Sequence, residues 1–154
     1  LLDSHDVSRF LTLCGGDRAR MEQAVLFQMS FPGMPCVFYG DEKGLEGASE
    51  NEYRRPMDFG RADGLEEAYR RMIALRKEHP ALRHGDFQTV LAQGALFLCR
   101  RSAAEESLLL CWNAGGEALP VPGLPKDALP LLQKGWKGGL LEGRGYVVFQ
   151  TAKP

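Results

Sequence analysis

The segment PGMPCVFYGDE occupies residues 32–42 and decides the fold that the sequence predicts. Four apolar residues, Cys36 to Tyr39, follow one another between a turn-forming Pro-Gly pair and a polar Gly-Asp-Glu run. A short apolar run without alternation is typical of a strand buried on both faces, as in a parallel sheet. Asp41 and Glu42 then stand at the carboxyl end of this strand, where parallel α/β folds place their ligand sites.

Two helical patterns flank this segment. Apolar residues recur at helical spacing over 18–30, and Asp17 stands just before them as an expected N-cap. A second helix is predicted over 63–78, where Asp63 and Glu66 form a pair resembling a capping box. The residue before a proline is pushed away from helical geometry, so this helix should end at the following His-Pro pair.

Leu1-Leu2 predicts the end of another buried strand, so residues 1–3 should lie parallel to residues 36–39. The order strand, helix, strand, helix is typical of an α/β fold with a parallel sheet. Two such units cannot bury both faces of a sheet or close a barrel. Because the first residue is also not Met, we expect this chain to be a piece of a longer protein.

The second half changes character. After the break at His79-Pro80, short apolar runs alternate with Gly, Pro and Asn. We predict strands at 89–92, 95–101, 108–112, 118–121, 129–133 and 146–151. Six short strands at this spacing favour an antiparallel sandwich or a small barrel. The predicted domains are therefore 1–80 and 81–154.

Composition excludes several classes of protein. Apolar residues make up 44% of the chain and charged residues 25%, which is ordinary for a globular domain and not for a disordered or collagen-like chain. The net charge of −1 gives no general reason to bind nucleic acid or anionic lipid. Nothing approaches the roughly 18 consecutive apolar residues of a transmembrane helix, so we expect no membrane partner.

The four cysteines, Cys14, Cys36, Cys99 and Cys111, are widely spaced and form no C-x-x-C pair. Metal ligation by these residues is disfavoured, and we expect buried, reduced thiols in a cytoplasmic protein. No Asp-rich loop has the spacing of a calcium site. We therefore predict neither a metal nor another cofactor.

Asp3-Ser4-His5-Asp6 is the sharpest polar cluster, because two carboxyl groups and an imidazole follow an apparent strand. A helix cap or a loop salt bridge explains the spacing equally well. Metal binding through Asp3, His5 and Asp6 is a third alternative, although no fourth ligand is evident.

Three ordered segments resemble the α-amylase family, glycoside hydrolase family 13. Residues 4–10, SHDVSRF, resemble its fourth signature region, and residues 32–42 look like its eighth barrel strand. Segments 44–47 and 54–57 are most similar to the neopullulanase, cyclomaltodextrinase and maltogenic amylase group. Residues 75–83 resemble the last barrel helix and its exit. The resemblance implies the last two β/α units of a (β/α)8 TIM barrel, followed by an antiparallel β-sandwich domain.

The resemblance also implies roles for single residues. Asp6 matches the third catalytic carboxylate, which favours an oxocarbenium-like transition state. His5 matches an imidazole that binds a sugar hydroxyl at the cleavage site. Glu50 and Arg54 stand where this group has an Asp and an Arg that bind sugar, so Glu50 departs from the pattern. For Arg54 a solvated charge is an alternative. The nucleophile and the general acid would precede this chain, which we therefore expect to be inactive alone.

The implied parent is a retaining hydrolase of α-glucosidic bonds in cyclodextrins, pullulan, starch or maltooligosaccharides, with an α-glucan as its partner. Transglycosylation and homo-oligomerisation stay open. A different alternative is a carbohydrate-binding or structural module without catalysis, since Trp112 and Trp136 could stack on sugars. Both tryptophans fit a core or interface role as well.

Overall fold

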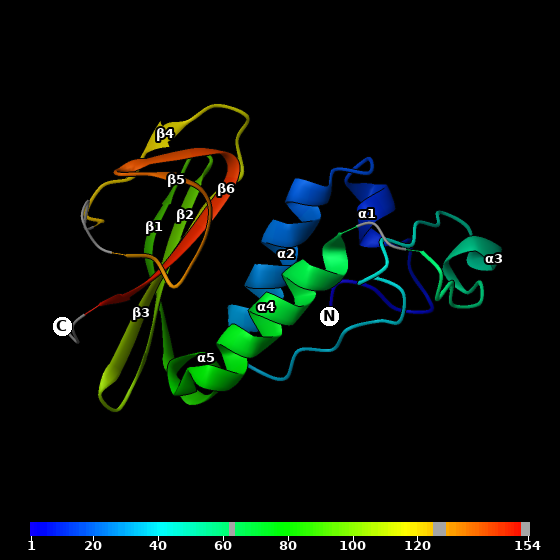
Figure 1. Cartoon of the computed structure of the whole chain (residues 1–154), viewed down its shortest axis with the longest axis horizontal. Helices are drawn as coiled ribbons and strands as arrows, with labels where there is room; N and C mark the ends of the chain where they lie inside the picture. Colours follow the sequence, from blue (N-terminus) through cyan, green and yellow to red (C-terminus); the bar gives the residue numbers. More distant parts are fainter. Residues whose placement is uncertain (62–63, 125–128, 152–154) are drawn as a thin grey trace. The chain divides into compact units, whose positions relative to one another are not determined.

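The computed structural model describes residues 1–61, 64–124 and 129–151 and divides into two compact units. Unit 1 comprises Leu1–Met29 and Gly33–Lys77, and unit 2 comprises Ser30–Pro32 and Glu78–Pro154. Figure 1 shows the helices α1 (Phe10–Leu13), α2 (Arg18–Ser30), α3 (Glu50–Tyr53), α4 (Leu65–Glu78) and α5 (Pro80–His84). The strands are β1 (Asp86–Gln93), β2 (Leu96–Ala103), β3 (Glu106–Asn113), β4 (Leu119–Pro120), β5 (Leu132–Lys137) and β6 (Leu140–Thr151).

The two long helices of unit 1 confirm the helical patterns. Asp17 caps α2, because its Oδ1 accepts the backbone N–H groups of Ala19 and Arg20 at 3.0 and 3.1 Å. The predicted capping residue Asp63 lies outside the described residues. Residues spaced along one face of α4 are buried, as its periodicity predicts: Leu65, Tyr69, Met72 and Leu75. None of the helices in the described part of the chain is long and apolar enough to cross a bilayer.

The predicted parallel strands are absent from the described residues, since 1–3 and 36–39 have no strand pairing. Side chains donate hydrogen bonds to backbone carbonyl oxygens within residues 36–39 instead. Gln28 donates to the carbonyl oxygen of Cys36 at 2.7 Å, and Arg9 donates to that of Tyr39 at 2.7 Å. A strand exists only where a neighbouring strand offers a ladder of hydrogen bonds. Without that neighbour the predicted burial of the segment is also wrong, and Cys36 is exposed.

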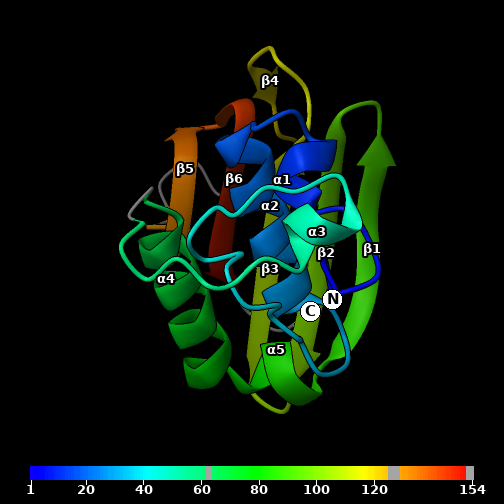
Figure 2. The same cartoon turned by 90° about the vertical axis from the view of Figure 1, so that its right-hand side faces the viewer.

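Each of the six predicted strand regions of the second half overlaps a strand, although β5 begins only at Leu132, and every pairing is antiparallel. The order is β1-β2-β3-β6-β4, with β5 also pairing with β6 (Figure 2). The described strands thus make one hydrogen-bonded antiparallel sheet, where an antiparallel sandwich or a small barrel was predicted. The reason is β6, which is 12 residues long and pairs with β3, β4 and β5. Length and Gly-rich turns predict strand positions, but they do not specify which strands pair.

One face of this sheet carries the core of unit 2. Its buried members are Leu98, Leu109, Cys111, Val121, Leu124, Leu141, Val147 and Phe149. Trp136 packs on this cluster, with its ring edge-on to Phe149 at a centroid distance of 5.4 Å. Trp112 is only 5% exposed and lies against Phe97 at 5.7 Å. Trp112 is therefore a core residue and offers no open face to a sugar.

The loop after β3 packs closely against the first residues of β6. Asn113 is fully buried, and its amide group donates to the carbonyl oxygens of Leu141 and Glu142 at 2.9 and 3.2 Å. A Cβ atom on Gly143 would overlap the backbone carbonyl of Gly116. The sheet therefore requires glycine at position 143 for space.

Candidate functional site

Four side chains predicted to act on substrate lie together in unit 1. Arg54 is the centre of this group: its Nη2 is 3.1 Å from Asp6 Oδ1, and its Nη1 is 2.7 Å from Glu50 Oε1. The Nε–H of Arg54 also donates to the carbonyl oxygen of His5 at 2.7 Å. The His5 imidazole is 3.1 Å from the second carboxylate oxygen of Asp6. We call His5, Asp6, Glu50 and Arg54 the surface cluster.

Local structure explains how α3 presents two of these residues. Glu52 accepts the backbone N–H groups of Ala48 and Ser49 at 2.8 and 2.9 Å, which closes the first turn of this short helix. These two hydrogen bonds hold the pKa of Glu52 below its usual range. Glu50 is the first residue of α3 and Arg54 follows its last residue, four positions on, so the two side chains project from the same side.

The surface cluster is open to solvent. The side chains of His5 and Asp6 are 67% and 62% exposed, and those of Arg54 and Glu50 are 45% and 64% exposed. Ion pairs this exposed contribute about 0–1 kcal/mol to stability, because water solvates the separated charges almost as well. An exposed set of two carboxylates, a guanidinium and an imidazole adds little to the fold and leaves polar atoms accessible to a ligand with hydroxyl groups.

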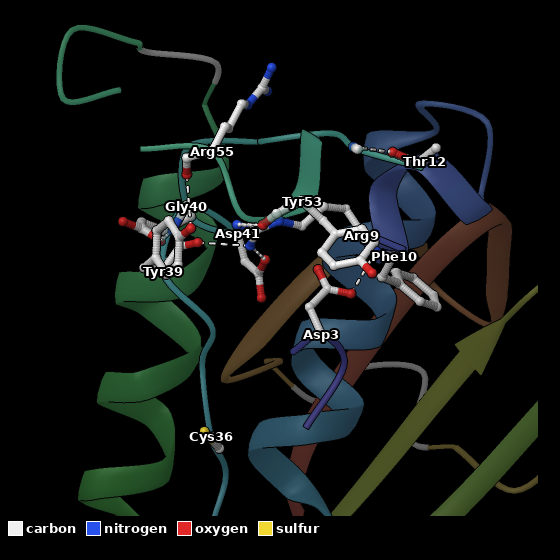
Figure 3. A network of polar contacts seen from close by, with 12 residues as sticks. Asp3, Arg9, Phe10, Thr12, Cys36, Tyr39, Gly40, Asp41, Tyr53 and Arg55 are labelled. Carbon is white, nitrogen blue, oxygen red and sulfur yellow. Dashed lines mark hydrogen bonds and ion pairs between the residues drawn. The ribbon is translucent and has the colours of Figure 1, made fainter. Parts of the chain in front are cut away.

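A second, buried network lies in the same unit (Figure 3). Arg9 is 0% exposed, and its Nη1 contacts Asp41 Oδ1 at 2.8 Å as well as the Tyr39 carbonyl oxygen. Its Nη2 donates to the carbonyl oxygen of Tyr53 at 3.0 Å. The guanidinium also lies over the Phe38 ring, 4.2 Å from its centroid. Arg9 thus joins three segments that are far apart in the sequence.

Asp3 and Asp41 are both 2% exposed and share this interior. Asp3 Oδ1 accepts the backbone N–H of Phe10 at 2.6 Å, while no described residue donates to Asp3 Oδ2. Burial, and then the neighbouring Asp3 carboxyl, raise the pKa of Asp41 to about 8, although Arg9 opposes the shift. The raised pKa favours the protonated form of Asp41 in the folded chain.

Sequence reasoning missed this buried network. Arg9 and Asp41 fall within the motifs, but an arginine in a polar stretch is expected to be solvated. The available signal was their position, because Arg9 directly precedes an apolar stretch and Asp41 follows another after a single glycine.

Metal binding has no support in the geometry. Among the described residues, no group of three or more His, Cys, Asp or Glu side chains could hold a metal ion. The candidate set Asp3, His5 and Asp6 divides, because Asp3 is buried against Phe10 while His5 and Asp6 are exposed and contact each other.

Unit 2 contains a large groove of about 1050 Å³ between β-strand ends and loops. Its described lining is mostly apolar and includes Leu91, Leu96, Val121 and Leu124. Glu117 is the one ionisable side chain in that lining. The described lining of the groove therefore lacks the pair of acids and bases that hydrolysis needs.

Comparisons with known proteins agree on one family. Residues 1–63 match the family model described as alpha amylase, catalytic domain. The chain is 35% identical over 151 residues to a cyclomaltodextrinase of Geobacillus thermopakistaniensis (strain MAS1), covering 95% of this chain and 25% of that protein. It is 40% identical over 122 residues to neopullulanase 2 of Thermoactinomyces vulgaris, covering 76% of this chain and 21% of that protein.

Solved structures give the same result. The debranching enzyme of Nostoc punctiforme, in its acarbose-soaked crystal, matches with a TM-score of 0.84 and 33% sequence identity. The match covers 97% of this chain and 33% of that one. The chain spans about a quarter of the length of the curated relatives it matches.

Proposed function

Since this chain belongs to the α-amylase family, we propose that it forms part of a retaining glycoside hydrolase. The proposed substrates are α-glucans: cyclodextrins, pullulan, starch or maltooligosaccharides. Relatives named cyclomaltodextrinase and neopullulanase support this substrate class. Calling the parent a hydrolase, and not a transglycosylase, is part of the proposal.

The proposed place of the chain is the end of a (β/α)8 barrel and the β domain that follows it. Residues 1–80 would supply the last two β/α units, and residues 81–154 the C-terminal domain. The helices α2 and α4, each preceded by an apolar segment, support this assignment. In a complete barrel, the neighbouring strands would give residues 1–3 and 36–39 the partners they need.

Asp6 is proposed as the carboxylate that favours the transition state. Positive charge develops on the sugar ring as the glycosidic bond breaks, so an ionised acid beside the ring lowers the barrier. The accessible Asp6 carboxylate can also accept hydrogen bonds from sugar hydroxyls. The Arg54 guanidinium lies 3.1 Å from this carboxylate.

The other members of the surface cluster are proposed to bind the substrate. The His5 imidazole can hydrogen-bond a hydroxyl of the same sugar, and Arg54 and Glu50 can bind that sugar or the next one. Glu50 is one methylene longer than the aspartate expected at this position. Its 2.7 Å contact with Arg54 shows that the longer side chain still reaches the centre of the cluster.

Retaining hydrolysis needs two further carboxyl groups, a nucleophile and a general acid, about 5–5.5 Å apart across the bond. Asp6 cannot fill both roles, and Asp41 is buried and paired with Arg9. We propose that both acids come from outside these 154 residues and that the chain is inactive alone.

The convergence of Asp6, His5 and Glu50 on Arg54 is the observation that carries this proposal. The test is to incubate the full-length gene product with cyclodextrin, pullulan, starch and maltooligosaccharides, with a β-linked cello-oligosaccharide as control. Proton NMR should show the α-anomer as the first product and no cleavage of the control. Absence of cleavage of every α-glucan, or release of the β-anomer, would overturn it.

A further inference from the structure

We propose that Arg9 is a positioning residue for the surface cluster: it fixes the segment that carries Arg54 and so holds the Asp6 carboxylate in place. The inference rests on the proposed function and extends it to a buried residue that has no access to substrate. It rests on a series of contacts within unit 1 that links Arg9 to Asp6 through Tyr53 and Arg54.

The series begins at Asp6, three residues before Arg9 in the sequence. The Arg9 guanidinium donates to the carbonyl oxygen of Tyr53 at 3.0 Å. Arg54 is the next residue, and it contacts Asp6 Oδ1 at 3.1 Å and the His5 carbonyl oxygen at 2.7 Å. A displacement of the Arg9 side chain therefore shifts Tyr53 and the adjacent Arg54, and through Arg54 it shifts the Asp6 carboxylate.

The helix α3 depends on contacts of this kind. A helix of four residues has no stability of its own, because nucleation costs more than so few hydrogen bonds return. The stretch around Arg9 also holds the loop before α3. Backbone N–H of Arg9 donates to the Gly47 carbonyl oxygen at 2.9 Å, and the Ser8 hydroxyl donates to that of Ala48 at 3.0 Å. Arg9 therefore contacts both the approach to α3 and its end.

An arginine is required by this geometry. Its Nη1 donates to Asp41 Oδ1 at 2.8 Å and to the Tyr39 carbonyl oxygen at 2.7 Å, while Nη2 donates to the carbonyl oxygen of Tyr53. The planar fork spans these acceptors, and its face stacks on the Phe38 ring. A lysine keeps the charge beside Asp41 but presents a single ammonium, so it cannot reach all three acceptors in fixed directions.

The test measures kcat and KM on maltooligosaccharides for four forms of the full-length protein: wild type, Arg9→Lys, Asp6→Asn and the double variant. Arg101→Lys is the matched control. Arg101 is also 0% exposed and donates to the carbonyl oxygens of Asp86 and Gly85 at 3.2 and 2.9 Å, but within unit 2. The folded fraction of each variant is measured by circular dichroism at the assay temperature.

We expect Arg9→Lys to lower kcat of the folded protein by about 10- to 100-fold, the scale for a misplaced catalytic group, and to change KM by less. Arg101→Lys should lose stability while kcat stays within about twofold. In the Asp6→Asn background, Arg9→Lys should cost less than about threefold, because the group it positions is already disabled.

Equal kcat losses in Arg9→Lys and Arg101→Lys, or losses that multiply fully in the double variant, would overturn the positioning role. An unchanged kcat in Asp6→Asn would instead refute the proposed function itself, so the two failures are distinguishable. If Arg9→Lys does not fold, Phe38→Leu replaces it, because it removes the ring under the guanidinium and leaves every donor. We expect a twofold to fivefold loss of kcat, about the worth of a cation–π contact, that vanishes with Asp6→Asn.

Discussion

Replacing Asp41 by asparagine tests the buried network through the pH dependence of stability. Burial, and then Asp3, raise the pKa of Asp41 in the folded chain from its ordinary value of 3.8 to about 8. A folded state that holds a proton more tightly than the unfolded chain is stabilised by protonation. This contribution is complete below pH 3.8 and is lost as the pH rises toward 8.

The magnitude follows from the same pKa values. Between pH 5 and 7 the unfolded chain has released the Asp41 proton and the folded chain keeps it, so stability falls with each pH unit. Over these two units the loss is about 3 kcal/mol in the free energy of unfolding. The Asp41→Asn variant cannot titrate there. Relative to this variant, wild type should therefore lose about 3 kcal/mol between pH 5 and 7.

Urea denaturation of the chain at pH 5, 6, 7 and 8 measures this difference. Circular dichroism at 222 nm reports mainly on unit 1, which holds nearly all of the residues of the long helices α2 and α4. Asp58→Asn is the control, because Asp58 is exposed and its side chain accepts a local hydrogen bond from the Gly60 backbone N–H at 3.0 Å. Parallel pH profiles for wild type and Asp41→Asn, or a wild type that gains stability relative to Asp41→Asn as the pH rises, would refute a raised pKa of Asp41 in the folded chain.

Two further predictions concern unit 2 and the thiols. Gly143→Ala should cost about 1–3 kcal/mol in urea denaturation, because the new methyl group overlaps the Gly116 carbonyl, whereas a methyl group on Gly116 meets nothing within 4 Å. A loss no larger than that of Gly116→Ala would contradict this close packing. Cys36 is exposed and should react with Ellman's reagent in the native chain. Cys99 and Cys111, whose burial raises each pKa to about 12, should react only on unfolding, and equal native rates would contradict their burial.

The strands of the second half were predictable because glycine turns separate their apolar runs. The exception is β5, predicted at 129–133 and found at Leu132–Lys137, since Gly135 interrupts the strand pattern with a bulge. The apolar run at 36–39 predicted a buried strand, but burial and pairing depend on neighbours that the pattern does not specify.

In the candidate site, too, the sequence identified single residues but not the contacts between them. Resemblance identified Asp6 and Arg54, but no spacing rule brings together residues that lie 48 positions apart. Arg9 could not be predicted to be buried, because its place in the interior depends on three acceptors from two other segments: Tyr39 and Asp41 in one, and Tyr53 in the other. Local patterns predict elements, whereas long-range polar networks follow only from the folded chain.

Turnover by the full-length protein carrying Asp6→Asn is the direct test of the catalytic role proposed for Asp6. Asparagine keeps the size and hydrogen bonding of Asp6 but removes the charge that would stabilise the transition state. We expect kcat on maltooligosaccharides to fall about 10²- to 10³-fold, or about 2.7–4 kcal/mol, while KM changes little. Thermal unfolding of the same sample separates this result from a loss of folded protein. Near wild-type kcat in folded Asp6→Asn protein would contradict the proposal that the Asp6 carboxylate stabilises the transition state.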